Sequence, residues 1–198
     1  PGSEIENNSF IDFNVANLRS CKLGEYLRKD WDRQDQDRHD EFSLWERNQF
    51  WLEDHVCFME LRRQNKELPW WEWPKKFSLR NTEALKIWCI ANKNNLLEHK
   101  LLQWHLDRQW QALRKLAKEL GVFLFGDVPF YVSRDSADVW SNRQLFSVLI
   151  NGDNYLQSGV PPDYFSSTGQ LWGNPVYRWS RHKSSSYKWW RNRFARHL

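Results

Sequence analysis

The sequence has few of the features that mark secreted, membrane or metal-dependent proteins. Only three of its 198 residues are cysteine, namely Cys21, Cys57 and Cys89, and no two of them form a Cys-x-x-Cys pair. This scarcity argues against both a disulfide framework and a structural zinc site. No apolar run approaches the roughly 20 residues that a membrane span needs, and the first residues carry no secretion signal. We therefore expect a cytoplasmic protein without a structural metal.

Nucleotide-binding fingerprints are missing as well. The sequence has neither a Gly-x-Gly-x-x-Gly pattern nor a Walker lysine motif, which disfavours a nucleotide site. What it has in excess is tryptophan, with 14 residues. Basic charge is also unevenly placed, because residues 179–198 hold six of the 29 Lys and Arg residues and none of the 25 acidic ones. The net charge of +4 therefore originates in this tail.

Helical patterns occupy much of the first half of the chain. Apolar residues between Phe42 and Leu61 recur mostly at three- and four-residue intervals, which predicts amphipathic helices. Pro69 and Pro74 then bracket three tryptophans in a segment that cannot lie inside a helix, so we expect a connector attached to the core by its rings. Asn81 is the predicted N-cap of the next helical region.

The end of this helical region predicts an α/β unit. An apolar stripe at helical spacing ends at Gly121, a predicted C-terminal helix cap. Residues 122–132, VFLFGDVPFYV, form a continuous apolar run that predicts a strand buried on both faces. Asp127 lies in this run after Gly126, and ligands of α/β folds are met where strands end. The alternative is a turn aspartate that accepts hydrogen bonds from its own backbone.

The segment GVPPDYFSSTGQLWGNPVYRW, residues 159–179, combines turn-forming residues with large rings. Sugar rings stack their apolar faces on aromatic side chains and need polar groups for their hydroxyls, which Asp163, Gln170 and Asn174 would supply. The segment is therefore a candidate carbohydrate site. The alternative is an ordered surface loop that is held in place by its own aromatic residues.

Four segments resemble the 4-α-glucanotransferases, the amylomaltases or disproportionating enzymes of glycoside hydrolase family 77, and they occur in that family's order. They are WLEDHVCFMELRRQNKELPWWEWP, RQWQALRKLAKELGV, GDVPFYVSRDSADVW and GVPPDYFSSTGQLWGNPVYRW. The resemblance implies a (β/α)8 barrel with helical insertions. It also implies transfer of an α-1,4-glucan segment from one chain to another by a retaining double displacement, with maltooligosaccharides as donor and acceptor.

The resemblance also assigns roles to single residues. Asp127 would hydrogen-bond a substrate hydroxyl near the scissile bond, Tyr164 and Phe165 would line the acceptor side, and Gln170 and Trp172 would reach the sugar beside the cleaved bond. The implied substrate-binding residues are thus Asp127, Asp163, Tyr164, Phe165, Gln170 and Trp172. The nucleophilic Asp and the acid/base Glu are expected downstream of Leu198, so no catalytic residue is expected in this chain.

We therefore expect an α/β chain that is a middle segment of an incomplete barrel. Residues 1–100 would be a mainly helical insertion, and residues 101–198 a barrel segment with a helix, a buried strand, a substrate-covering loop and the start of the next helix. Neither nucleic acid nor a membrane is an expected partner. Two alternatives stay open: a freestanding carbohydrate-binding module, and a single-stranded nucleic-acid binder that uses the basic, aromatic tail.

Overall fold

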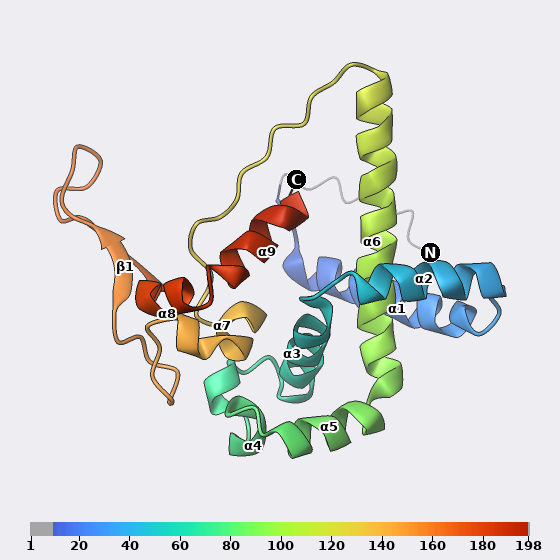
Figure 1. The fold of residues 1–198 in the computed structure, drawn as a ribbon, viewed down its shortest axis with the longest axis horizontal. Coiled ribbons are helices and arrows are strands. Elements are labelled where there is room, and N and C mark those ends of the chain that lie inside the picture. The colour runs from blue at the N-terminus through green and yellow to red at the C-terminus, as the bar shows by residue number, and fades with distance from the viewer. Residues whose placement is uncertain (1–9, 198) are drawn as a thin grey trace.

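The computed structural model describes residues 10–197, which form a helical body with a β-hairpin at one side (Figure 1). The strands are β1 (Gln157–Val160) and β2 (Gln170–Pro175), and two short 3-10 turns are η1 (Trp70–Glu72) and η2 (Arg143–Leu145). The helices are α1 (Phe13–Trp31), α2 (Gln36–Arg47), α3 (Leu52–Gln64), α4 (Lys75–Ser78), α5 (Thr82–Ala91), α6 (Lys93–Glu119), α7 (Ala137–Ser141), α8 (Trp179–Ser184) and α9 (Lys188–His197). Within residues 10–197, each helix is too short or too polar to cross a membrane.

The long helix α6 organises the first part of the chain. It packs against α1, α2, α3 and α5. A small hydrophobic cluster of Trp31, Phe42, Leu101 and Trp104 joins α1, α2 and α6. The predicted division between residues 100 and 101 falls inside this continuous helix. The two predicted parts therefore share one helix.

Two sequence-predicted helix ends are confirmed. The Asn81 side chain caps α5 by accepting a hydrogen bond from the backbone N–H of Ala84 at 2.9 Å. At the end of α6, Gly121 adopts a left-handed φ of 69°, and the N–H of Val122 donates to the carbonyl of Ala117 at 2.8 Å. This is the hydrogen-bond pattern that a glycine stop provides.

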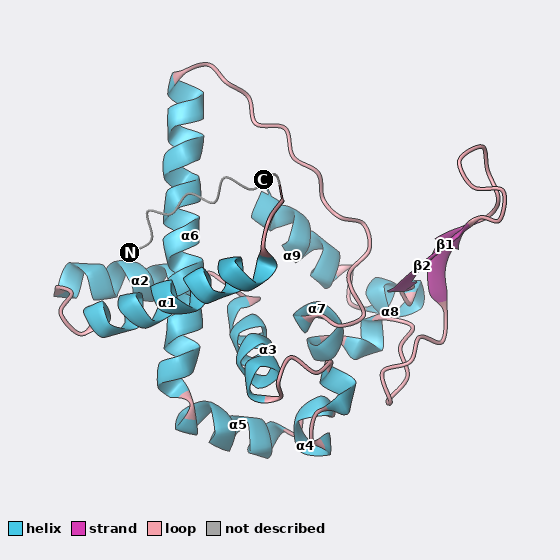
Figure 2. Ribbon diagram, turned by 180° about the vertical axis from the view of Figure 1, so that it is seen from behind, coloured by secondary structure: helices cyan, strands magenta, loops and turns pink. Residues whose placement is uncertain are grey.

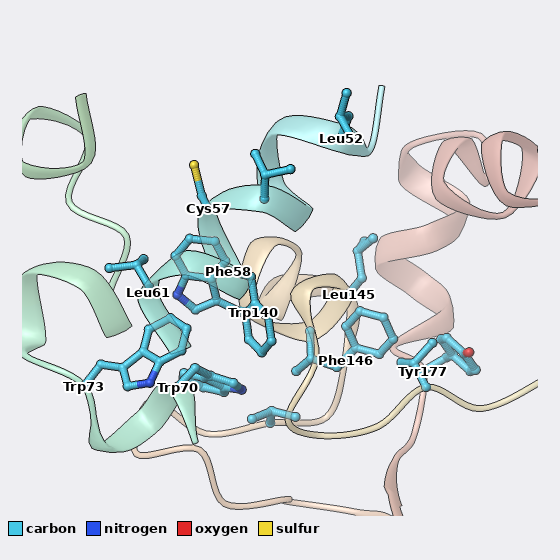
Figure 3. Close-up of a cluster of buried hydrophobic side chains, with 14 of the residues drawn as sticks. Leu52, Cys57, Phe58, Leu61, Trp70, Trp73, Trp140, Leu145, Phe146 and Tyr177 are labelled. Carbon is cyan, nitrogen blue, oxygen red and sulfur yellow. The ribbon is translucent and has the colours of Figure 1, made fainter. Parts of the chain in front are cut away.

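The tryptophan-rich connector is attached to the main core by its rings, as expected. Trp70 and Trp140 are fully buried, and they pack with residues of α3 such as Leu61 (Figure 3). Each indole N–H donates to a backbone carbonyl: that of Trp70 to Arg134 at 2.9 Å and that of Trp140 to Phe77 at 3.0 Å. Both rings are shielded from solvent and both indole N–H groups have a hydrogen-bond partner. Each ring therefore contributes about 2–3 kcal/mol of hydrophobic stabilisation.

A buried carboxylate links α3 to α6. Glu60 is fully buried and accepts hydrogen bonds from Arg63 at 2.6 and 2.8 Å, from Gln64 at 2.8 Å and from Asn95 at 2.8 Å. His99 lies 3.3 Å from the same carboxylate. Burial by itself would raise the pKa of Glu60, but the hydrogen bonds from His99 and its other partners outweigh burial and lower that pKa.

The predicted strand at residues 122–132 is wrong for this structure. These residues form an extended loop between α6 and α7 (Figure 2). The Phe123 and Phe125 side chains are exposed. A strand needs a neighbour for its backbone N–H and C=O groups. Within residues 10–197 the only sheet pairs β1 with β2, so this run has no strand beside it. Helices and strands are both present as expected, whereas parallel barrel strands are not formed within residues 10–197.

Candidate functional site

The β-hairpin displays most of the residues that the sequence marks as a carbohydrate site. Strands β1 and β2 pair antiparallel, with Val160 opposite Gln170, and the loop between them extends away from the helical body (Figure 2). Gly169 closes this loop with a φ of 73°, and a Cβ atom there would lie 2.5 Å from the carbonyl oxygen of Val160. Both the left-handed backbone and the close approach require glycine.

The Asp163 carboxylate organises the tip of the hairpin. Its Oδ1 accepts hydrogen bonds from the backbone N–H of Phe165 at 2.9 Å and of Ser166 at 2.8 Å. This is the local turn that aspartate forms with its own backbone. It holds Tyr164 and Phe165 edge to face, 5.7 Å apart, with 97% and 88% of their surfaces exposed. The tip therefore presents two rings to solvent on a hydrogen-bonded frame.

Strand β2 presents a third ring. The indole N–H of Trp172 donates to Oε1 of Gln170 at 3.0 Å, and the Trp172 ring meets the edge of Tyr131 with centroids 6.0 Å apart. Trp172 remains 45% exposed. A ring held from two sides with part of its surface open is suited to stack on a flat apolar ligand surface.

Tyr177 anchors the base of the hairpin. Its buried hydroxyl donates to the carbonyl of Phe130, and its ring stacks on Tyr131 at an interplanar angle of 14°. Burial raises the pKa of Tyr177 to about 12, so the hydroxyl stays protonated and remains a donor. Tyr177 therefore ties the end of the 122–132 loop to the hairpin.

The structure brings together five of the six predicted site residues. Asp163, Tyr164, Phe165, Gln170 and Trp172 all lie on the hairpin. Asp127 is exposed in the 122–132 loop, and among residues 10–197 it makes no hydrogen bond or ion pair with the hairpin. Sequence reasoning missed Tyr131 as a support for Trp172, since the only signal was an aromatic pair after Pro129.

A cavity of about 370 Å³ lies elsewhere, between α3, α7 and α9, and none of the six predicted residues lines it. Its wall includes Trp51, His55, Asp138, Asn142, Trp189 and Asn192. In the described part of the chain, His, Cys, Asp and Glu residues form no group of three or more arranged to hold a metal ion. The exposed rings of the hairpin and this cavity are thus in different places.

The basic, aromatic tail folds back on the rest of the chain. Trp190 is buried against Tyr177, with ring centroids 5.0 Å apart. Arg193 donates to the carbonyl of Pro129 at 2.8 Å, and the Arg196 guanidinium lies over the Trp51 ring at 4.0 Å. Single-stranded nucleic-acid binders need accessible rings beside free cations, and these side chains are engaged within the chain instead.

Exposed rings and the Gln170 amide thus lie together on one hairpin. The chain belongs to the 4-alpha-glucanotransferase family, whose sequence pattern it matches over residues 3–198. It is 44% identical over 149 residues to a 4-alpha-glucanotransferase of Synechocystis sp., and this match covers 75% of this chain and 30% of that relative. It is 40% identical over 153 residues to a 4-alpha-glucanotransferase of Thermus thermophilus, which covers 77% of this chain and 31% of that relative.

The fold is similar to that of a solved member of the same enzyme class. An amylomaltase from Streptococcus agalactiae, determined in complex with acarbose, superposes with a TM-score of 0.75 and 32% sequence identity. The match covers 80% of this chain and 32% of that one. The chain thus spans about a third of the length of the relatives that it matches.

Proposed function

We propose that this chain is a segment of an enzyme that transfers α-1,4-glucan segments between maltooligosaccharides, and that the hairpin is part of its substrate-binding surface. The observation that carries the proposal is the display of Tyr164, Phe165 and Trp172 on an ordered hairpin in a member of the 4-alpha-glucanotransferase family. Apolar rings gathered on an exposed surface mark an interaction site.

Trp172 is the stacking platform for the sugar beside the cleaved bond. Its position is supported by the hydrogen bond to Gln170 and by the contact with Tyr131. Since Oε1 of Gln170 is occupied by the indole, its amide nitrogen is the group left to donate to a sugar hydroxyl. Asp163 binds substrate only through its second carboxylate oxygen, because Oδ1 already accepts two backbone N–H groups.

Tyr164 and Phe165 cover the acceptor side of the site. In a retaining double displacement, a carboxylate forms a covalent glycosyl-enzyme while a carboxylic acid protonates the leaving oxygen. A sugar hydroxyl must then reach the intermediate before water does. Two apolar rings over the acceptor position exclude water and so favour transfer over hydrolysis.

Asp127 joins the site when residues 122–132 become a barrel strand. The exposed Phe123 and Phe125 side chains support this, since both would be buried by helices and strands on either side of that strand. In this proposal, residues 1–100 are the helical insertion and residues 101–198 the barrel segment. The nucleophile and the acid/base are contributed by other parts of the longer enzyme, which works in the cytoplasm without metal or organic cofactor.

The test is Trp172→Ala in the full-length enzyme. Because the variant loses the platform that positions the donor sugar, disproportionation of maltotriose should fall by roughly tenfold or more in kcat/KM. The matched control is Tyr26→Ala, which removes an exposed ring from α1, far along the chain from the hairpin. Unchanged kinetics for Trp172→Ala would refute the assignment.

A freestanding carbohydrate-binding module is separable from this proposal. Such a module would retain maltooligosaccharides when residues 1–198 are expressed alone and run by affinity electrophoresis. We expect no retention, because the acceptor rings act together with groups of the longer enzyme. Retardation that is lost in the Trp172→Ala variant would favour the module.

A further inference from the structure

Two cysteines that are far apart in the sequence meet in the structure. Cys57 on α3 and Cys89 on α5 are separated by 32 positions, yet their sulfur atoms lie 3.4 Å apart. Both are free thiols, as is Cys21, which is exposed on α1. A disulfide has a sulfur–sulfur bond of roughly 2 Å, so the two sulfur atoms need to approach by about 1.4 Å to form one.

The two thiols differ in their surroundings. Cys57 is buried in the main core, and Figure 3 shows its sulfur pointing away from the rings of Phe58 and Trp140. Burial, followed by the neighbouring Cys89, raises the pKa of the Cys57 thiol far above its usual range. Cys89 is partly exposed. An oxidant from solution therefore reaches Cys89 first. Cys57 lies deeper in the core and is still a protonated thiol at that stage.

We propose that Cys57 and Cys89 are an oxidation site, which hydrogen peroxide converts into an intramolecular disulfide between α3 and α5. The site is remote in sequence from the hairpin and does not depend on the glucan-transferring function. None of the six candidate substrate-binding residues takes part in it.

The reaction proceeds in two balanced steps. The Cys89 thiolate attacks one peroxide oxygen, the O–O bond breaks, and the departing hydroxide takes a proton to leave as water, which gives a sulfenic acid at Cys89. The Cys57 sulfur then attacks the Cys89 sulfur, and the hydroxyl group leaves as a second water with the Cys57 proton. The two thiols lose two electrons, and the peroxide is reduced to two waters.

The geometry explains why the pair should stop at the disulfide. A sulfenic acid that meets a second thiol at contact distance condenses faster than it meets another peroxide, so sulfinic acid does not accumulate. The new bond joins two helices that both pack on the main core, and it closes a loop across their sequence separation. Cross-linking of this kind restricts the unfolded chain and stabilises the folded one.

The experiment treats the full chain with hydrogen peroxide and counts free thiols under denaturing conditions. Within residues 1–198, the wild type should fall from three free thiols to one, and dithiothreitol should restore all three. A non-reducing peptide map should join the Cys57 and Cys89 peptides. The oxidised wild type should also melt at a higher temperature than the reduced protein.

Two variants control for the third cysteine and for the pairing itself. Cys21→Ser should fall from two free thiols to none, because the pair is intact, whereas Cys89→Ala should form no intramolecular disulfide and show no rise in melting temperature. The proposal is overturned if the wild type forms disulfide-linked dimers through Cys21 only. It is equally overturned if all three thiols persist, or if Cys89 proceeds to a sulfinic acid that dithiothreitol cannot reverse.

Discussion

The helical body and the hairpin use the same residue types in opposite ways. In the body, Trp70 and Trp140 are buried, and each indole N–H donates to a backbone carbonyl. On the hairpin, Tyr164 and Phe165 are held almost wholly in solvent by a turn around Asp163. A ring in the first setting stabilises the fold, while a ring in the second setting contributes little to folding and is available to a ligand.

The carboxylates of the body and of the hairpin also differ in their hydrogen-bond partners. Glu60 is dry and joins α3 to α6 through side chains from both helices. Among residues 10–197, the Asp163 carboxylate accepts hydrogen bonds from two backbone N–H groups, both within three residues of itself. The body therefore depends on contacts between distant segments, whereas the tip of the hairpin is organised locally.

The largest expected effect comes from removing a buried ring. Trp140→Ala should lower the free energy of unfolding by about 3–5 kcal/mol, because it loses apolar burial and leaves a cavity in the main core. Phe165→Ala, its matched control on the hairpin, should change that free energy by less than about 0.5 kcal/mol. Urea titrations of both variants measure the change in unfolding free energy. Similar changes for the two variants would contradict the difference between the body and the hairpin.

The buried carboxylate gives the next effect. Glu60→Ala should lower the free energy of unfolding by about 3 kcal/mol, because Arg63, Asn95 and His99 lose their shared acceptor. The control is Glu119→Ala, which removes an exposed carboxylate 3.9 Å from Lys115 and should cost less than about 0.5 kcal/mol.

The Glu60 effect should also depend on pH. The folded protein lowers the pKa of Glu60, so the stabilisation is present above the ordinary carboxyl pKa and is lost as the pH falls through the lower, folded value. The difference in unfolding free energy between the wild type and Glu60→Ala should therefore become smaller at acidic pH. A difference that does not change with pH would show that Glu60 is not an ionised carboxylate held by its hydrogen-bond partners.

His55 should make the body sensitive to mild acid. Burial, followed by the charges of His99 and Arg196, lowers the pKa of His55 to about 4. The unfolded chain therefore binds this proton at a higher pH than the folded chain, and stability falls as the pH drops from about 6.5 toward 4. His55→Gln should reduce the loss of unfolding free energy between neutral pH and pH 5 by at most about 2 kcal/mol. An identical loss in wild type and variant would show that other groups cause it.

The smallest expected effect belongs to the tip of the hairpin. Tyr164→Ala in the full-length enzyme should raise the ratio of hydrolysis to transfer by roughly threefold, because water gains access to the acceptor side. Its melting temperature should stay that of the wild type, which separates this change from those in the body. Reducing-end assays set beside maltotriose disproportionation give the ratio, and a constant ratio would count against a water-excluding role.

Several features were predictable because their signals are local. The Asn81 cap and the Gly121 stop each follow from residues a few positions apart. The family was recognisable for a related reason, since its motifs are continuous stretches such as the one that forms the hairpin. The clustering of five candidate residues on that hairpin follows from their nearness in sequence.

Other features needed contacts between distant segments. The apolar run at residues 122–132 has the composition of a buried strand, yet a strand requires a neighbouring backbone, and residues 10–197 place none beside it. The support of Trp172 by Tyr131 and the meeting of Cys57 with Cys89 likewise join positions far apart in the chain. By itself, the sequence determined the helix ends, the turns and the family, because caps and turns form between near neighbours. Only the tertiary structure decided which rings are buried, which are displayed and which thiols touch, because those outcomes depend on what packs from elsewhere.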